Sequence, residues 1–331
     1  MFVSTRERWS EGSTVRLSHD EECDWLEHLR YRTSGGFVTA ADVHVSVMNV
    51  GGEMSNVVGN GSQGSVHRTG DFAVKVLRQS RSKTLLERFR REAHILARLA
   101  HSNVCHLEGV GSAFGRPCLV LEWVETDLAR AMMEMPNLER LRVAGELASA
   151  LAHLHSGDAI EDGLVVIHRD VKPANVGITG SGQVKLLDFG LATVVVAAPE
   201  QSKKEKSTTW QLTGGIGSPL YTAPENACHL DYGTPTDVYS FALTVWELFA
   251  LEGMPFPDMS FDDLQKKVIR DGHRPKIPKI WHPRLAALLD KAWAPRPDRR
   301  PTAVELANKL RTFRRDPLSP SFSFLCHHPR R

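Results

Sequence analysis

The stretch IHRDVKPANVGI, residues 167–178, packs unusual chemistry into a short loop. Within eight positions it places His168, Arg169, Asp170, Lys172 and Asn175, and apolar residues bound it on both sides. A solvated surface loop could carry such a set without any function. The other interpretation is that the loop handles a charged substrate, and other parts of the chain must decide between the two.

A glycine-rich run lies further upstream, at GNGSQGSV, residues 59–66. Glycines let the backbone approach phosphates closely and expose its N–H donors. A dinucleotide-binding turn with similar spacing opens a helix. Here the run VHRTGDFAVKVL follows instead, which predicts two strands joined by a turn at Thr69-Gly70-Asp71. The glycines therefore lie between two strands, and an ordinary flexible hairpin remains the alternative.

The second of these strands contains Lys75, flanked by apolar residues. A lysine in such a strand should be exposed or paired. The following run LLERFRREAHIL has helical periodicity and offers two acidic residues, Glu87 and Glu92. An ion pair from this helix would hold the Lys75 ammonium in place to grip ATP phosphates, and a surface salt bridge is the plainer alternative.

A third polar site follows at VKLLDFGLA, residues 184–192. The pattern predicts a strand over Val184–Leu187 that ends in Asp188, with a glycine two positions later. An acidic residue on such a turn suits a Mg²⁺ ligand, and Asn175 could supply a second oxygen. Taken alone, Asp188 could also belong to a simple turn.

In this order the motifs resemble a eukaryotic-type protein kinase domain over residues of roughly 55–313. The chain is most similar to the Ser/Thr class and, through WELFALEGMPF and GHRPKIP, to its tyrosine-kinase-like group. The resemblance implies an α+β, two-lobed fold, with a small antiparallel β-sheet lobe carrying one key helix and a larger, mainly helical lobe. The expected divisions are an N-terminal extension over 1–54, an N-lobe over about 55–121, a hinge over 122–127, a C-lobe over 128–313 and a flexible basic tail over 314–331.

The resemblance also implies a role for each matching residue. The catalytic group would comprise Asp170 as base or hydroxyl-orienting residue, Lys172, and the pair Lys75 and Glu92, with Glu92 preferred to Glu87 from the family spacing. Mg²⁺ would bind Asn175 and Asp188. The residues expected to bind ATP are Gly59, Asn60, Gly61, Ser62, Gln63, Gly64, Val66, Ala73, Lys75, Leu121, Glu122, Val124 and Asp127. Glu225 is expected to brace Arg300, and Asp237 to anchor the catalytic loop.

By the same resemblance the protein is expected to be a Ser/Thr kinase that uses ATP with Mg²⁺, or Mn²⁺ as a substitute, on protein substrates. Lys172, two residues after Asp170, disfavours a tyrosine or dual-specificity kinase, and Ser218 stands where threonine is commoner. Gly177 departs from the family, which has a bulky apolar residue there under adenine, and Ile178 is a candidate to compensate. The alternative is a catalytically weak pseudokinase acting as a nucleotide-binding or scaffold module.

Activation by phosphorylation is expected in the polar stretch 192–216, by an upstream kinase or by autophosphorylation. The arginine–aspartate pair Arg169-Asp170 is similar to that of kinases in which a phosphate added to this segment pairs with the arginine and orders the segment. The candidate acceptors are Thr213, Thr209, Thr208 and Ser207.

Composition adds bounds on the setting. The 331 residues are 41% hydrophobic, which suits one large two-lobed domain or two small ones. The net charge of +2 gives no case for nucleic acid as a partner. Five scattered cysteines indicate a reducing, intracellular setting, with the cytoplasm expected first and the nucleus as an alternative. No secretory signal is expected, because the first residues lack an apolar run. Phe241–Met254 is too short and too charged to span a membrane, so it predicts a buried core helix.

Overall fold

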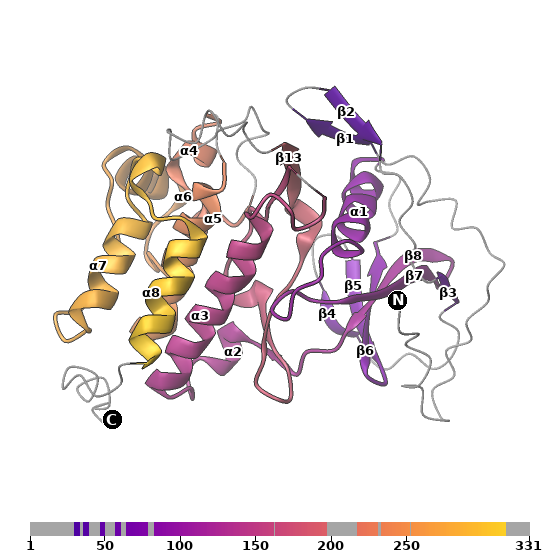
Figure 1. The fold of residues 1–331 in the computed structure, drawn as a ribbon, viewed down its shortest axis with the longest axis horizontal. Helices are drawn as coiled ribbons and strands as arrows, with labels where there is room; N and C mark the ends of the chain where they lie inside the picture. Colours follow the sequence, from indigo (N-terminus) through magenta and orange to yellow (C-terminus); the bar gives the residue numbers. More distant parts are fainter. Residues whose placement is uncertain are drawn as a thin grey trace. The chain divides into compact units, whose positions relative to one another are not determined.

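The computed structural model describes residues 30–33, 36–39, 47–49, 57–60, 64–78, 83–161, 163–196, 217–230, 233–251 and 253–315. These residues form two compact units. From residue 47 onward, the first unit contains the described residues up to 98 together with 105–123, and the second contains 99–104 and those from 124 onward. The first is dominated by a sheet and the second by helices, as the two-lobed kinase fold predicts (Figure 1).

The first unit is built on a six-stranded sheet with the strand order β3-β7-β8-β6-β5-β4. Its elements are β3 (Val47–Asn49), β4 (Val57–Asn60), β5 (Gly64–Thr69), β6 (Phe72–Leu77), helix α1 (Lys83–Leu96), β7 (Leu107–Ala113) and β8 (Arg116–Glu122). The predicted hairpin is present, because β5 and β6 pair antiparallel around Gly70, whose φ is +57°. The parallel pairing of β3 with β7 was not predicted, since an antiparallel sheet was expected and all other neighbouring strands of this sheet pair antiparallel. The rest of the run 43–47, where the sequence suggests a strand, lies outside the described residues.

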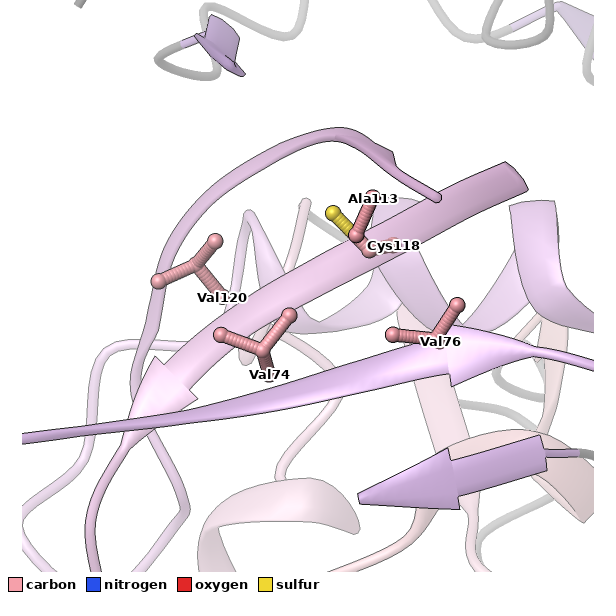
Figure 2. Packing of buried hydrophobic residues seen from close by; sticks show 5 residues of the cluster. All are labelled: Val74, Val76, Ala113, Cys118 and Val120. Atoms are coloured by element: carbon pink, nitrogen blue, oxygen red, sulfur yellow. The ribbon is translucent and has the colours of Figure 1, made fainter. Parts of the chain in front are cut away.

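One face of this sheet is a tightly packed apolar cluster. Val74 and Val76 on β6 face Val120 and Cys118 on β8, and Ala113 closes the group (Figure 2). All five are at most 3% exposed. Because side chains alternate along a strand, Lys75 between the two valines points to the opposite face of the sheet. The cluster therefore fixes the orientation of β6 and, with it, the side on which the lysine lies.

The second unit is mainly helical. Its helices are α2 (Leu128–Ala131), α3 (Asn137–Leu154), α4 (Pro224–Ala227), α5 (Pro235–Ala250), α6 (Phe261–Asp263), α7 (Pro283–Ala292) and α8 (Ala303–Arg315), with 3-10 turns η1 (Pro173–Asn175), η2 (Phe189–Leu191), η4 (Pro219–Tyr221) and η6 (Pro297–Arg299) and a π-helical segment η5 (Leu264–Arg270). Helices α3 and α8 lie side by side (Figure 1).

Both long helices were predicted from periodicity or composition. The helical periodicity of residues 137–156 predicts one helix face formed by Leu141, Ala144, Leu147, Leu151 and Leu154, and in α3 all five are no more than 1% exposed. Helix α5 is buried along almost its whole length, so the core helix predicted over Phe241–Met254 is confirmed as far as Ala250. The helix ends there, and Met254, at the end of the predicted run, is 53% exposed. None of the described helices is both long enough and apolar enough to cross a membrane.

Short strands complete the second unit and carry the polar loops. A three-stranded sheet has the order β12-β11-β9 and consists of β9 (Thr126–Asp127), β11 (Val176–Ile178) and β12 (Val184–Leu186). A separate antiparallel pair consists of β10 (Leu164–Ile167) and β13 (Thr193–Val196). The loop 168–175 therefore runs from β10 to β11, and Asp188 lies just beyond β12. A further two-stranded sheet, β1 (Arg30–Thr33) with β2 (Gly36–Thr39), was not predicted.

The expected brace between Glu225 and Arg300 is present in the second unit. The guanidinium donates to both carboxylate oxygens, from Nη1 at 2.7 Å and from Nη2 at 2.8 Å. The arginine side chain is completely buried. This contact ties α4 to the segment that follows η6, 75 residues further along the chain.

Candidate active site

The loop 168–175 is held by a buried carboxylate on α5. The backbone N–H groups of His168 and Arg169 donate to the two oxygens of Asp237 at 2.9 and 2.8 Å, and His155 donates from Nε2 at 2.9 Å. Burial acts to raise the pKa of Asp237, but the hydrogen bond from His155 and the charges of His155 and His168 bring the pKa below its ordinary value. Asp237 thus anchors the loop through its backbone and leaves the side chain of Asp170 for other contacts.

The backbone at Arg169 is in an unusual conformation, which a neighbouring glycine accommodates. Arg169 has a φ of +69°, a region that costs a non-glycine residue energy and that recurs at functional sites. A Cβ on Gly217 would lie 2.6 Å from the carbonyl oxygen of Arg169, and the φ of Gly217 is itself +109°. Gly217 therefore allows the backbone at 217–218 to lie directly against the loop.

The Asp170 carboxylate lies at the centre of a small hydrogen-bond network. Its Oδ1 accepts from the N–H and the hydroxyl of Ser218 at 3.0 and 2.9 Å. Its Oδ2 accepts from Lys172 Nζ at 2.8 Å and from Asn175 Nδ2 at 2.9 Å. Lys172 Nζ also donates to Ser218 Oγ at 2.7 Å. Asp170, Lys172 and Asn175 were candidates from the sequence, whereas a contact between Ser218 and this group was not foreseen.

Oxygen ligands suited to Mg²⁺ are present in the same unit. The amide nitrogen of Asn175 donates to the backbone carbonyl and to the carboxylate of Asp170. The amide oxygen of Asn175 therefore points away from Asp170 and could bind a metal ion. The Asp188 side chain is exposed, and the residue has a φ of +55° just after β12. His168 holds this turn, because its Nε2 donates to the Leu187 carbonyl at 2.9 Å and its ring meets Phe189 edge-on. A carboxylate and an amide oxygen suit a magnesium ion that takes its other ligands from phosphates and water.

In the first unit, Lys75 pairs with Glu92 and not with Glu87. The ammonium donates to both oxygens of Glu92, at 2.7 and 2.8 Å. Glu92 is 1% exposed on the inner side of α1, whereas Glu87 points to solvent on the same helix. The Lys75–Glu92 contact that the family spacing favoured is therefore present, and the role of the pair in binding ATP stays a prediction.

The glycine-rich hairpin is described only in part. Gly61, Ser62 and Gln63 lie outside the described residues, while β4 and β5 carry the flanking positions. A Cβ on Gly64 would lie 1.9 Å from the Val76 carbonyl oxygen, so this glycine is required by the packing of the sheet itself. Val66 is half-buried and Ala73 is 9% exposed. Packing of the sheet therefore explains the glycine at position 64 without any bound ligand.

The predicted hinge residues divide between the two units, and two of them have other partners. Glu122 in the first unit accepts the His106 N–H with its side chain at 2.7 Å and donates its own N–H to His106 at 3.0 Å. Asp127, expected near the ribose, accepts the N–H of Arg130 at 3.0 Å and caps α2. Leu121 and Val124 are half-buried.

The departure at Gly177 is not offset by Ile178. Ile178 is 8% exposed, and as the next residue along β11 it points to the opposite face of the sheet. The side chains that approach Gly177 are those of Val124 and Leu187.

The four candidate phosphorylation sites, Ser207, Thr208, Thr209 and Thr213, lie outside the described residues. Arg169, which was expected to meet the phosphate, donates from Nε to the Leu191 carbonyl at 2.6 Å.

Comparison with known proteins agrees with this geometry. The family model described as protein tyrosine and serine/threonine kinase matches residues 51–310. The dual specificity protein kinases shkC and shkA of Dictyostelium discoideum are 29% and 32% identical, each over 77% of this chain, which covers 50% and 48% of their lengths. The serine/threonine-protein kinase STY46 of Arabidopsis thaliana is 28% identical over 82% of this chain and 48% of its own length. The chain therefore spans about half the length of these curated relatives.

Proposed function

This chain belongs to the protein tyrosine and serine/threonine kinases, and we propose that it transfers the γ-phosphoryl group of ATP to serine and threonine hydroxyls of protein substrates. The proposal includes a kinase domain over about 55–313, with an N-lobe to 121, a hinge over 122–127 and a C-lobe from 128. It places the protein inside the cell, in the cytoplasm first and the nucleus second.

The network around Asp170 is the observation that carries this proposal. In the reaction, the substrate hydroxyl oxygen attacks the γ-phosphorus, and the bond to the β,γ-bridging oxygen breaks as ADP leaves. Asp170 orients the hydroxyl and takes its proton, while Lys172, 2.8 Å from Asp170, neutralises charge on the transferring group. The protein supplies position and charge, because phosphoryl transfer needs little covalent help.

The remaining site residues serve the nucleotide. Asn175 and Asp188 would hold Mg²⁺, for which Mn²⁺ can substitute, and the metal supplies charge neutralisation at the phosphates when bound. Lys75, held by Glu92, contacts the α- and β-phosphates, and the 59–64 hairpin covers them. Leu121, Glu122, Val124 and Asp127 are proposed to bind the nucleoside, Glu122 and Val124 through their backbone groups.

Ser218 supports the choice of serine and threonine as acceptors. Lys172 Nζ donates both to the Asp170 carboxylate at 2.8 Å and to the Ser218 hydroxyl at 2.7 Å, so Ser218 belongs to the same network as this lysine. This lysine is the residue that distinguishes the chain from tyrosine kinases at this loop. Two of the relatives are named dual specificity kinases, so phosphotyrosine must be measured as well.

Phosphorylation at Thr213, Thr209, Thr208 or Ser207 is proposed to activate the protein, through an upstream kinase or through autophosphorylation. An added phosphate beside Arg169 could form charge-assisted hydrogen bonds that order the segment. Phosphopeptide mapping of the active protein tests this part. An active enzyme that carries no modification across 202–218 would exclude it.

The central test is phosphate transfer from radiolabelled Mg–ATP to a generic protein substrate, with phosphoamino-acid analysis. The Asp170→Asn variant keeps the shape of the side chain and is expected to lower kcat by about 10²–10⁴-fold, the usual contribution of a positioned base. Phosphoserine or phosphothreonine from the natural chain, and little from the variant, supports the proposal. Phosphotyrosine alone would contradict the substrate class. No transfer at all, from protein already phosphorylated in the activation segment, would favour a pseudokinase.

A further inference from the structure

Strand β12 lies at the edge of its sheet, where backbone groups lack ladder partners. The strand order β12-β11-β9 leaves β12 with a neighbouring strand on one side only. An edge strand carries N–H and carbonyl groups that no other strand satisfies. Val184 and Leu186 flank Lys185 in β12, and neither has any exposed surface. Because buried backbone groups require partners, the outer edge of β12 must be bonded to other parts of the chain.

Asn103 and Glu146 supply these partners from two separate segments. The side-chain amide of Asn103 donates from Nδ2 to the Val184 carbonyl at 3.0 Å, and the Asn103 carbonyl accepts the Leu186 N–H at 2.8 Å. Glu146 on α3 accepts the Val184 N–H with Oε2 at 3.1 Å. The same Oε2 accepts from Asn103 Nδ2 at 3.2 Å, which joins the two residues. We refer to Asn103 and Glu146 as the β12 clamp.

The β12 clamp is itself held in one arrangement by further bonds. Asn103 is 6% exposed, and its N–H donates to Nδ1 of His101 at 3.1 Å. The second carboxylate oxygen of Glu146 accepts from Arg142 Nη1 at 2.6 Å. Arg142 also donates to the carbonyl of Gly182, in the turn that joins β11 to β12. Both oxygens of Glu146 are therefore bonded, and its side chain is fixed against the strand.

Strand β12 leads directly to Asp188, which lies two residues after Leu186. Leu187 between them donates its N–H to the Asn175 carbonyl at 2.9 Å, and its carbonyl accepts from His168 Nε2 at 2.9 Å. The backbone from β12 to Asp188 is thus bonded at successive residues. A displacement of β12 along its edge would therefore move the Asp188 carboxylate as well.

We infer that the β12 clamp sets the position of Asp188 and, through it, the affinity of the site for a divalent metal ion. Glu146 and Asn103 act as positioning residues, since they contact β12 and act on the metal only through Asp188. This inference rests on the proposed function, because it takes Asp188 as a metal ligand. It requires that loss of the clamp weakens metal binding and leaves the binding of metal-free nucleotide unchanged.

The experiment measures Mn²⁺ binding to the natural full-length chain with saturating ADP, from the electron paramagnetic resonance signal of the free ion. Glu146→Leu keeps a similar volume and removes the acceptor for Val184. Its affinity for Mn²⁺ is expected to fall about tenfold, a usual loss when a residue that orients a metal ligand is removed. Glu146→Gln keeps one oxygen for the Val184 N–H, so it should retain most of the affinity. The Kd of ADP in the presence of EDTA should be the same in all three proteins.

Two controls separate this effect from a general loss of stability. Leu310→Ala opens a cavity on α8 beside Gly145 of the same helix α3, so it should lower the unfolding temperature without changing the Mn²⁺ affinity. Glu139→Gln removes one charge from the contact with the same Arg142 and should also leave the Mn²⁺ affinity unchanged. A loss of Mn²⁺ affinity in Leu310→Ala equal to that in Glu146→Leu would overturn the positioning role.

A milder variant keeps the inference testable if Glu146→Leu does not fold. Glu146→Asp preserves the charge and shortens the side chain by one methylene, which draws the carboxylate away from Val184. It is expected to weaken Mn²⁺ binding several-fold, again with an unchanged Kd for ADP in EDTA. A Glu146→Asp protein that binds Mn²⁺ as the natural chain does would overturn the inference.

The Asp188→Asn variant in the same assay separates this inference from the proposed function. If Asp188→Asn loses Mn²⁺ affinity and neither Glu146→Leu nor Glu146→Asp does, the inference is overturned and the proposed function stands. If Asp188→Asn binds Mn²⁺ as the natural chain does, both the metal role of Asp188 and the inference are refuted. The expected pattern of Mn²⁺ affinities without any phosphate transfer would refute the activity and leave the role of the β12 clamp standing.

Discussion

The two units contain a buried ion pair each, and the two pairs are built differently. In the second unit, Arg300 has five N–H donors and five acceptors: both oxygens of Glu225 and the carbonyls of Ala294, Pro235 and Pro295. Its guanidinium also lies over the Tyr239 ring, 5.0 Å from the centroid. In the first unit, the Lys75 ammonium donates to both oxygens of Glu92, and 11% of the lysine side chain is exposed.

The difference separates a structural contact from one that can act on a ligand. Every donor of Arg300 is used inside the protein and the side chain has no exposed surface, so the pair can only join segments of the chain. Lys75 is a compact charge that still reaches solvent from its strand, so an anionic ligand can approach it. Similar charge chemistry thus supports the fold in one unit and, by our proposal, the reaction in the other.

Breaking the Arg300 pair should cause the largest loss of stability. Glu225→Ala leaves the buried guanidinium without its counter-ion, which typically costs about 3–5 kcal/mol of unfolding free energy. Denaturant unfolding measures this loss. The control is Arg296→Ala, which removes an exposed pair with Asp298 and should leave the unfolding midpoint unchanged within error. A Glu225→Ala protein as stable as the natural chain would show that the brace is not needed.

Substituting Lys75 should instead affect the reaction most. Lys75→Met removes a charge at the phosphates, and the loss of one such stabilising donor lowers kcat by about 10²–10³-fold. Steady-state kinetics with Mg–ATP measures the effect, and unfolding of the same sample shows how much of it comes from stability. Activity within tenfold of the natural enzyme would place Lys75 with Arg300 among the structural contacts.

Acid should weaken the second unit through two stacked histidines. The rings of His101 and His153 lie 4.9 Å apart, and burial lowers the pKa of both below 6.5. The positive charges of His153 and Lys185 lower the pKa of His101 further, whereas the charge of Asp158 acts to raise the pKa of His153. The neutral ring of His101 also accepts the backbone N–H of Asn103 at 3.1 Å.

Below pH 6.5 these histidines bind protons more readily in the unfolded chain than in the folded chain, so the free energy of unfolding decreases as the pH falls below 6.5. Thermal unfolding at pH 7.5 and at pH 5.5 measures the change, which should be smaller than that in Glu225→Ala. His101→Gln should flatten the dependence. A His101→Gln protein with the same slope as the natural chain would assign the effect to other groups.

The smallest effect is expected at a surface turn of the first unit. Phe114 and Gly115 join β7 to β8 with φ values of +53° and +67°, and Phe114 is 62% exposed. Asparagine tolerates this conformation better than phenylalanine, so Phe114→Asn should stabilise the protein by up to about 1 kcal/mol. Chemical denaturation measures the gain. A loss instead would show that the contacts of the ring with His67 and Arg116 outweigh the strain.

Much of the candidate site follows from residues that are close in the sequence. Asp170, Lys172 and Asn175 share one loop between two short strands, so their meeting needs little beyond the loop itself. Ser218 is different, because it joins Asp170 from 48 residues away and carries no local signal of that contact. The His101–His153 stack and the parallel pairing of β3 were missed for the same reason.

The sequence by itself determined the order of the motifs, the helices with strong periodicity and the family resemblance, since these depend on spacing along the chain. The family spacing favoured Glu92 over Glu87 as the partner of Lys75, but the sequence could not decide which side chain fills the space at Gly177. Only the packing of α1 on its sheet turns Glu92 inward, and only the pairing of β9, β11 and β12 brings Val124 and Leu187 together. Contacts between distant segments depend on how whole elements pack, and no local pattern of residues encodes that geometry.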